Sequence, residues 1–146
     1  MRKTLSTGIN YIGAAIKEGQ TLSGVDTAPD ALRNSGLFDS LKKKFNVEVK
    51  DYGNISLKEL NKTGNIIHPD PAQQTHQVRN LHLLDPLLHE LSNTCTRAIE
   101  DNPDNIQVTV GGDHSVATGS IHALMKKHND LKVIWVDAHP DMSNVT

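Results

Sequence analysis

The order of apolar and polar residues along the chain predicts strands that alternate with helices. Short runs of β-branched and other apolar residues predict strands, and apolar positions three or four apart predict amphipathic helices. Strands are expected at residues 7–15, 47–52, 106–110 and 131–137. Helices are expected from Pro29 to near Gly36, at 38–45, from Asp85-Pro86 to Ile99, and at 115–128. This alternation is typical of an α/β fold with a parallel sheet.

Three segments need closer attention. The longest helix is expected to begin afresh at Pro86, because proline inside a helix costs about 3 kcal/mol. Its apolar face includes Leu91 and Cys95, so Cys95 is interpreted as a small core residue. The segment 53–71 is polar, shows no period, and is expected to be an irregular connection. The continuous apolar run at 131–137 is what a strand covered on both faces shows.

Acidic residues and histidines follow two of the predicted strands. Asp113 and His114 come after the third strand, and Asp137, His139 and Asp141 come after the fourth. Adjacent parallel strands deliver the residues beyond their carboxyl ends to one crevice, so the two clusters are expected to face each other there.

The spacing of the second cluster, Asp-x-His-x-Asp, favours a metal site. In an extended chain the side chains of Asp137, His139 and Asp141 point the same way. With ligand residues at positions +2 and +4, Asp137 is the natural carboxylate to bridge two metal ions. Carboxylate and imidazole donors without thiolate suit harder divalent ions such as Mn²⁺. The alternative is a helix-start histidine at 114 and a solvated loop, but two such clusters after buried strands favour metal binding.

The composition narrows the class of protein further. A chain of 146 residues has the length of one domain. Its net charge of −2 gives no case for binding nucleic acid or a membrane surface. The chain shows no membrane-spanning run and no signal-peptide pattern. One cysteine fits a reducing compartment, so we expect a cytoplasmic location, with a mitochondrial one left open.

The two clusters also carry a family resemblance. Gly111-Gly-Asp-His-Ser115, followed at 133–141 by Val-Ile-Trp-Val-Asp-Ala-His-Pro-Asp, resembles the arginases, of the ureohydrolase family of binuclear manganese hydrolases. The N-terminal segments agree in order: Ile12-Gly13-Ala14, Lys17-Glu-Gly-Gln20, Gly24-Val25, Pro29, Leu32-Arg33, Gly36-Leu37 and Asp51-Tyr52-Gly53. The resemblance runs from about residue 10 to the end of the chain and covers about the first half of a family member.

The resemblance implies an incomplete three-layer α/β fold with a parallel sheet, in which residues 1–146 form about half of one ureohydrolase domain. It implies that His114 and Asp141 ligate one Mn²⁺ ion, that His139 ligates a second, and that Asp137 ligates both. The reaction it implies is hydrolysis of L-arginine to L-ornithine and urea. Two such ions lower the pKa of a bridging water, and the resulting hydroxide can attack a guanidinium carbon. The resemblance also leaves a homo-oligomer open and puts the loop 17–24 at the active-site mouth.

In the family, a second bridging aspartate, a D-x-D motif and an acid/base histidine lie farther downstream than Thr146. We therefore assign no catalytic residue here and expect little or no turnover by this chain alone. Met142-Ser143-Asn144 and Pro140 depart from the usual arginase residues, so Asn144 receives no substrate role. Two alternatives stay open: an inactive fragment or isoform that binds metal weakly and associates with other subunits, and an agmatinase-type ureohydrolase. The loop 17–24 and Asp51-Tyr52-Gly53 favour arginase over the latter.

Overall fold

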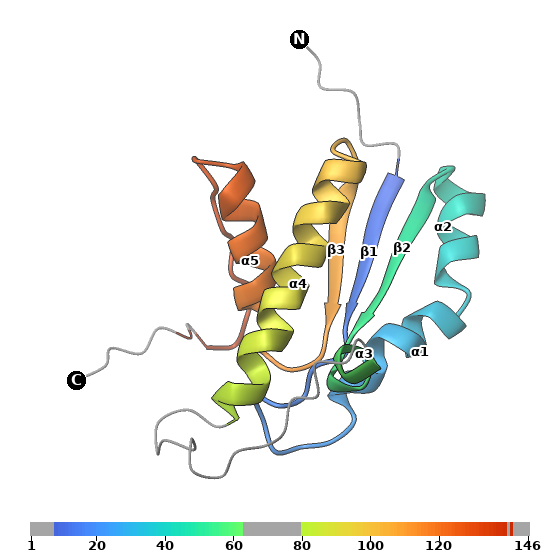
Figure 1. The fold of residues 1–146 in the computed structure, drawn as a ribbon. Helices are drawn as coiled ribbons and strands as arrows, with labels where there is room; N and C mark the ends of the chain where they lie inside the picture. Colours follow the sequence, from blue (N-terminus) through green and yellow to red (C-terminus); the bar gives the residue numbers. More distant parts are fainter. Residues whose placement is uncertain (1–7, 63–79, 140, 142–146) are drawn as a thin grey trace.

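The computed structural model describes residues 8–62, 80–139 and 141 (Figure 1). Its elements are β1 (Gly8–Ala14), the 3₁₀ turn η1 (Val25–Thr27), α1 (Ala28–Asn34), α2 (Leu37–Phe45), β2 (Glu48–Ile55), α3 (Leu57–Lys62), α4 (Leu81–Asp101), β3 (Ile106–Gly111) and α5 (Val116–Lys127). The described strands form one sheet in the order β2-β1-β3, with both pairs parallel. The predicted α/β fold with a parallel sheet is therefore confirmed.

The central strand β1 contacts helices on both faces of the sheet. On one face the hydroxyl of Tyr11 donates to the carbonyl of Pro29 in α1 at 2.8 Å. On the other, the side-chain amide of Asn10 donates to the carbonyl of Ala98 in α4 at 2.7 Å. Because successive strand residues point to opposite faces, α1 and α4 cover opposite sides of the sheet. The expected helix–sheet–helix layering is present, with α4 in front of the sheet in Figure 1 and α5 packed against α4.

The core lies between the sheet and α4. Apolar residues of α4 three or four positions apart are buried there, as the period predicts. The core cluster comprises Ile12, Ala14, Ile16, Ile55, Leu84, Leu87, Leu91, Cys95, Ala98 and Ala123. Cys95 is fully buried, which confirms its interpretation as a core residue.

Hydrogen bonds of Arg33 connect α1 to β2. Its guanidinium donates to both carboxylate oxygens of Asp51, at 2.6 and 2.8 Å, and to Asp30 at 2.8 Å. It also lies over the ring of Tyr11, 4.8 Å from the centroid. The hydrogen bond from Arg33 lowers the pKa of Asp51 below its ordinary value, although partial burial opposes the shift. Gly53 has a φ of 80° next to the register shift between β1 and β2, a backbone state that favours glycine.

Pro86 lies inside α4 and does not begin a helix, which corrects the expectation. The helix starts at Leu81, and Pro86 lacks the N–H that would bond the carbonyl of His82. Leu83 and Leu84 lie before the proline and are buried with the rest of the apolar face. Burying two leucines contributes about 1.5–3 kcal/mol each, which is enough to offset the roughly 3 kcal/mol cost of an interior proline.

The strand predicted at 131–137 is absent, and this prediction was wrong. Residues 131–136 are irregular and have no strand partner within the described ranges. Ile134 is 88% exposed and Val136 is 92% exposed. A parallel strand takes its hydrogen bonds from its neighbours, and the described sheet ends at β3.

The segment 53–71 was also misread in part, because β2 continues to Ile55 and α3 follows it. Leu57 and Leu60 of α3 are partly buried against the core, and this packing supports a helix too short to show a period in the sequence. Among the described helices, none is long and apolar enough to cross a membrane.

Candidate metal centre

A tight turn after β3 delivers His114. The N–H of Gly112 donates to the carbonyl of Ala14 at 3.1 Å, and the N–H of Asp113 donates to the carbonyl of Ile16 at 2.8 Å. The turn therefore lies directly against the chain that leaves β1. A Cβ on Gly112 would overlap the carbonyl oxygen of Ile16 and lie 2.6 Å from that of Ala14, so only glycine fits. His114 follows just before α5, with its side chain 57% exposed.

The structure brings Asp137 and Asp141 against His114. The imidazole Nε2 of His114 lies 3.3 Å from Oδ2 of Asp141 and 3.8 Å from Oδ2 of Asp137. One ligand atom from each of the three residues lies within 4.8 Å of the others. The side chains come from two segments far apart in sequence, the turn after β3 and the segment after α5. Two carboxylate oxygens and one imidazole nitrogen therefore converge on one point at the surface.

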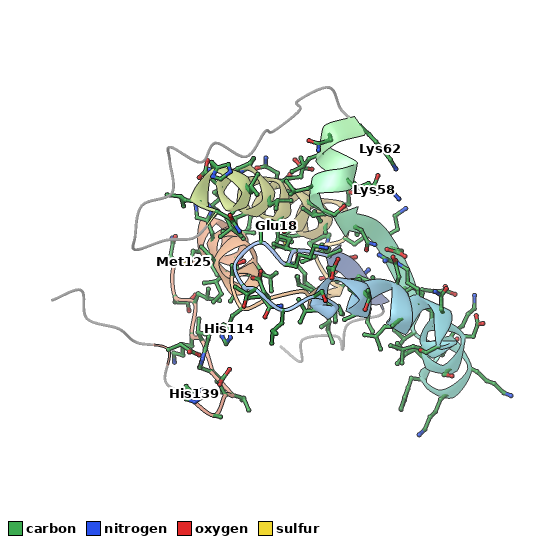
Figure 2. The ribbon with its side chains drawn as sticks, turned by 90° about the horizontal axis from the view of Figure 1, so that it is seen from below. Glu18, Lys58, Lys62, His114, Met125 and His139 are labelled. Carbon is green, nitrogen blue, oxygen red and sulfur yellow. The ribbon has the colours of Figure 1, made fainter. Side chains whose placement is uncertain are left out.

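His139 stands beside this group without joining it. Its Nδ1 lies 3.7 Å from Oδ1 of Asp137, and its side chain is 81% exposed. Its backbone N–H donates to the same Oδ1 at 3.0 Å, a local side-chain-to-backbone bond that bends the segment. The Asp-x-His-x-Asp segment is therefore not the straight extended run that the spacing suggested. Figure 2 views the molecule from the carboxyl ends of the strands, and it shows His114 and His139 on the same side of the molecule.

Trp135 contributes to the site, and the sequence reasoning missed it. Its indole N–H donates to Oδ2 of Asp141 at 2.9 Å, and its ring lies 5.4 Å from that of His114. The sequence does contain a signal for this role of Trp135. An indole N–H usually pairs with a hydrogen-bond acceptor, and alternate residues of an extended chain, such as Trp135, Asp137 and Asp141, point the same way.

Asp113 follows β3 as expected but faces away from this group. Its carboxylate is buried and accepts hydrogen bonds from Gly19 in the loop 17–24 and from Ser115 at the start of α5. The loop that the resemblance puts at the active-site mouth therefore contacts the turn that carries His114.

The remaining histidines differ in their surroundings. His89 in α4 and His122 in α5 are exposed. His82 is half-buried, and both of its ring nitrogens are inaccessible and have no hydrogen-bond partner within the described part of the chain. His68 and His76 lie outside the described residues, as do Pro140 and residues 142–146.

Fold and site together define an α/β protein with a cluster of metal-ligating side chains beyond the carboxyl edge of a parallel sheet. The sequence model of the Arginase family matches residues 8–146, and the chain belongs to that family.

Similarity to individual proteins agrees with this assignment. The chain is 34% identical over 140 residues to the arginase of Staphylococcus aureus strain MRSA252, which covers 96% of this chain and 43% of the relative. It is 35% identical over 139 residues to human arginase-1, covering 94% of this chain and 39% of the relative. The chain therefore spans less than half the length of these relatives.

Solved structures give the same result. A crystal structure of arginase from Bacillus subtilis matches with a TM-score of 0.72 and 29% identity, covering 93% of this chain and 40% of that one. The arginase of Entamoeba histolytica, solved in complex with L-ornithine, matches with a TM-score of 0.70 and 27% identity, covering 97% of this chain and 44% of that one.

Proposed function

We propose that this chain supplies part of the manganese centre of an arginase-type hydrolase, which converts L-arginine to L-ornithine and urea. The observation that carries the proposal is the meeting of His114 with Asp137 and Asp141 beside the end of β3, in a chain of the arginase family.

The side chains present fit a hard divalent ion. Carboxylate oxygens with an imidazole nitrogen suit Mn²⁺, whereas a thiolate site would favour softer metals. The cysteine of this chain is buried in the core, away from the group. We assign His114, Asp137 and Asp141 to one ion and His139 to a second. Asp137 is shared between the two, since one of its oxygens approaches His114 and the other approaches His139.

Divalent ions held by these residues would lower the pKa of bound water, so that hydroxide would be available near neutral pH. The residues of the chain hold and orient this site. Trp135 donates to Asp141 and so restricts the direction in which that carboxylate points, as partners of metal ligands do. We assign no acid/base residue among the described residues and propose that this chain alone turns over arginine slowly or not at all.

A second candidate is a metal-binding chain that acts by associating with another subunit. The observation in its favour is the exposure of Val133, Ile134 and Val136, apolar side chains that a partner could cover. A longer open reading frame that continues into a D-x-D motif would favour the first candidate, whereas activity gained only when a second subunit is added to this chain would favour this one.

The test of the metal centre is a calorimetric Mn²⁺ titration of the chain and of Asp137→Asn. We expect the substitution to weaken binding at least about tenfold, since losing even a hydrogen-bond partner of a ligand costs about 10- to 100-fold. The matched control is Asp39→Asn, which removes an exposed carboxylate from α2 and should leave the affinity unchanged. Equal Mn²⁺ affinities in the wild type and Asp137→Asn would refute the proposed centre.

A further inference from the structure

Asp113 is a buried carboxylate that accepts hydrogen bonds on both of its oxygens. Only 8% of the residue is exposed. Its Oδ2 accepts from the backbone N–H of Gly19 at 2.7 Å. Its Oδ1 accepts from the backbone N–H of Ser115 at 2.9 Å and from the Ser115 hydroxyl at 2.5 Å. A buried carboxylate is costly unless such donors satisfy it, so this arrangement holds its surroundings in place.

The bonds of Asp113 fix the backbone on both sides of His114. Before the histidine, the N–H of Asp113 donates to the carbonyl of Ile16. After it, the carboxylate holds both the backbone and the hydroxyl of Ser115, the N-cap residue of α5. His114 therefore projects toward Asp137 and Asp141 from a backbone that is anchored at each neighbour.

The same carboxylate also reaches the loop 17–24. A Cβ on Gly19 would lie 2.9 Å from Oδ1 of Asp113, so the loop backbone approaches the carboxylate closely. Asn80, the residue before α4, donates from its side chain to the carbonyl of Glu18 at 2.8 Å and holds the loop from its other side. The Gly19–Asp113 bond is thus a direct link between this loop and the turn of His114.

We propose that Asp113 is a positioning residue: it sets the direction of His114 at the metal centre and couples that centre to the loop 17–24. This inference rests on the proposed metal centre. Metal bound through His114 restricts the turn, the turn restrains Gly19 through Asp113, and ordering of the loop in return strengthens metal binding.

The discriminating variant is Asp113→Asn. Its amide carries one acceptor oxygen and one NH₂ group, so it cannot accept from both Gly19 and Ser115, whichever way it is oriented. We expect Mn²⁺ affinity to fall about tenfold, within the range for partners that orient metal ligands. The visible absorption of bound Co²⁺, which reports ligand geometry, should change shape. Hydrogen exchange of the Gly19 amide should become faster, and Mn²⁺ should no longer slow it.

Two controls separate positioning from general stability. Ile12→Val trims a fully buried residue of β1 and lowers stability without touching the turn; its Mn²⁺ affinity and Co²⁺ spectrum should match the wild type. Gly19→Ala leaves Asp113 intact and displaces the loop from it. In Gly19→Ala, the amide of residue 19 should also exchange fast, and Mn²⁺ should not slow this exchange. If Asp113→Asn fails to fold, this variant tests whether the loop is coupled to the metal centre.

The outcomes are distinguishable. A wild-type chain that binds no Mn²⁺ would refute the metal centre, and this inference with it. Wild-type binding that is equalled by Asp113→Asn, with an unchanged Co²⁺ spectrum, would refute the inference alone. Equal losses of affinity in Asp113→Asn and Ile12→Val would show that Asp113 acts only through stability, which also overturns it.

Discussion

Gly112→Ala tests the close approach on which the His114 turn depends. The three atoms nearest to the added Cβ would all be backbone atoms: the carbonyl oxygens of Ile16 and Ala14, and the nitrogen of Ile16 at 2.8 Å. Backbone cannot rotate away as a side chain can, so the turn must move off the chain that leaves β1. That movement breaks the bonds from Gly112 to Ala14 and from Asp113 to Ile16.

The expected loss of stability follows from these contacts. Two hydrogen bonds contribute about 0.5–1.5 kcal/mol each, and more where a buried group is left unpaired. Replacing glycine by alanine also lowers the conformational entropy of the unfolded chain, which by itself raises the free energy of unfolding by about 0.4–1 kcal/mol. We therefore expect Gly112→Ala to lower the free energy of unfolding by about 1.3 kcal/mol at the middle of these ranges and by at most about 2.6 kcal/mol, and to weaken Mn²⁺ binding because His114 is displaced.

Urea unfolding followed by far-UV circular dichroism measures this change, with an unchanged m-value showing that both chains unfold alike. Gly111→Ala is the matched control, because its Cβ would meet Cγ2 of Val116 at 2.6 Å, a side-chain atom that can shift. We expect it to cost less than Gly112→Ala, because the Val116 side chain can change rotamer whereas the backbone of residues 14–16 cannot move aside in that way. A Gly112→Ala chain as stable as the wild type, or one destabilised no more than Gly111→Ala, would contradict the backbone-contact argument.

Two further predictions concern groups away from the site. Because the bond from Arg33 lowers the folded pKa of Asp51, the unfolded state takes up protons first as pH falls. The stabilisation is therefore present above the ordinary carboxyl pKa of about 3.9 and is lost in more acid solution. The cost of Arg33→Gln in urea unfolding should be smaller at low than at neutral pH, and an equal cost at both would count against the ion pair. Burial raises the pKa of the Cys95 thiol, so a thiol reagent should label it only as the chain unfolds; rapid labelling of the wild type in native buffer would contradict its place in the core.

Much of the fold could be read from local patterns. The runs at 7–15 and 106–110 became β1 and β3, and the helical period after Pro86 became most of α4. These predictions succeeded because apolar periodicity reports which face of an element is buried. Pro86 and α3 were misjudged because a proline penalty or a missing period is a local signal, whereas burial of the surrounding leucines is decided by packing.

The candidate site divides in a similar way. Sequence alone determined which residues have metal-ligating chemistry and that His114 stands at the end of a strand. Only the tertiary structure decided that Asp137 and Asp141 lie against His114 and that His139 does not join them. It also decided that Trp135 donates a hydrogen bond to Asp141 and that Asp113 accepts one from Gly19. It also left the apolar run at 131–136 exposed where the pattern predicted a buried strand. The physical reason is that side-chain chemistry and periodicity are properties of neighbouring residues, whereas strand pairing and convergence of distant side chains depend on which other segments are there to pack against.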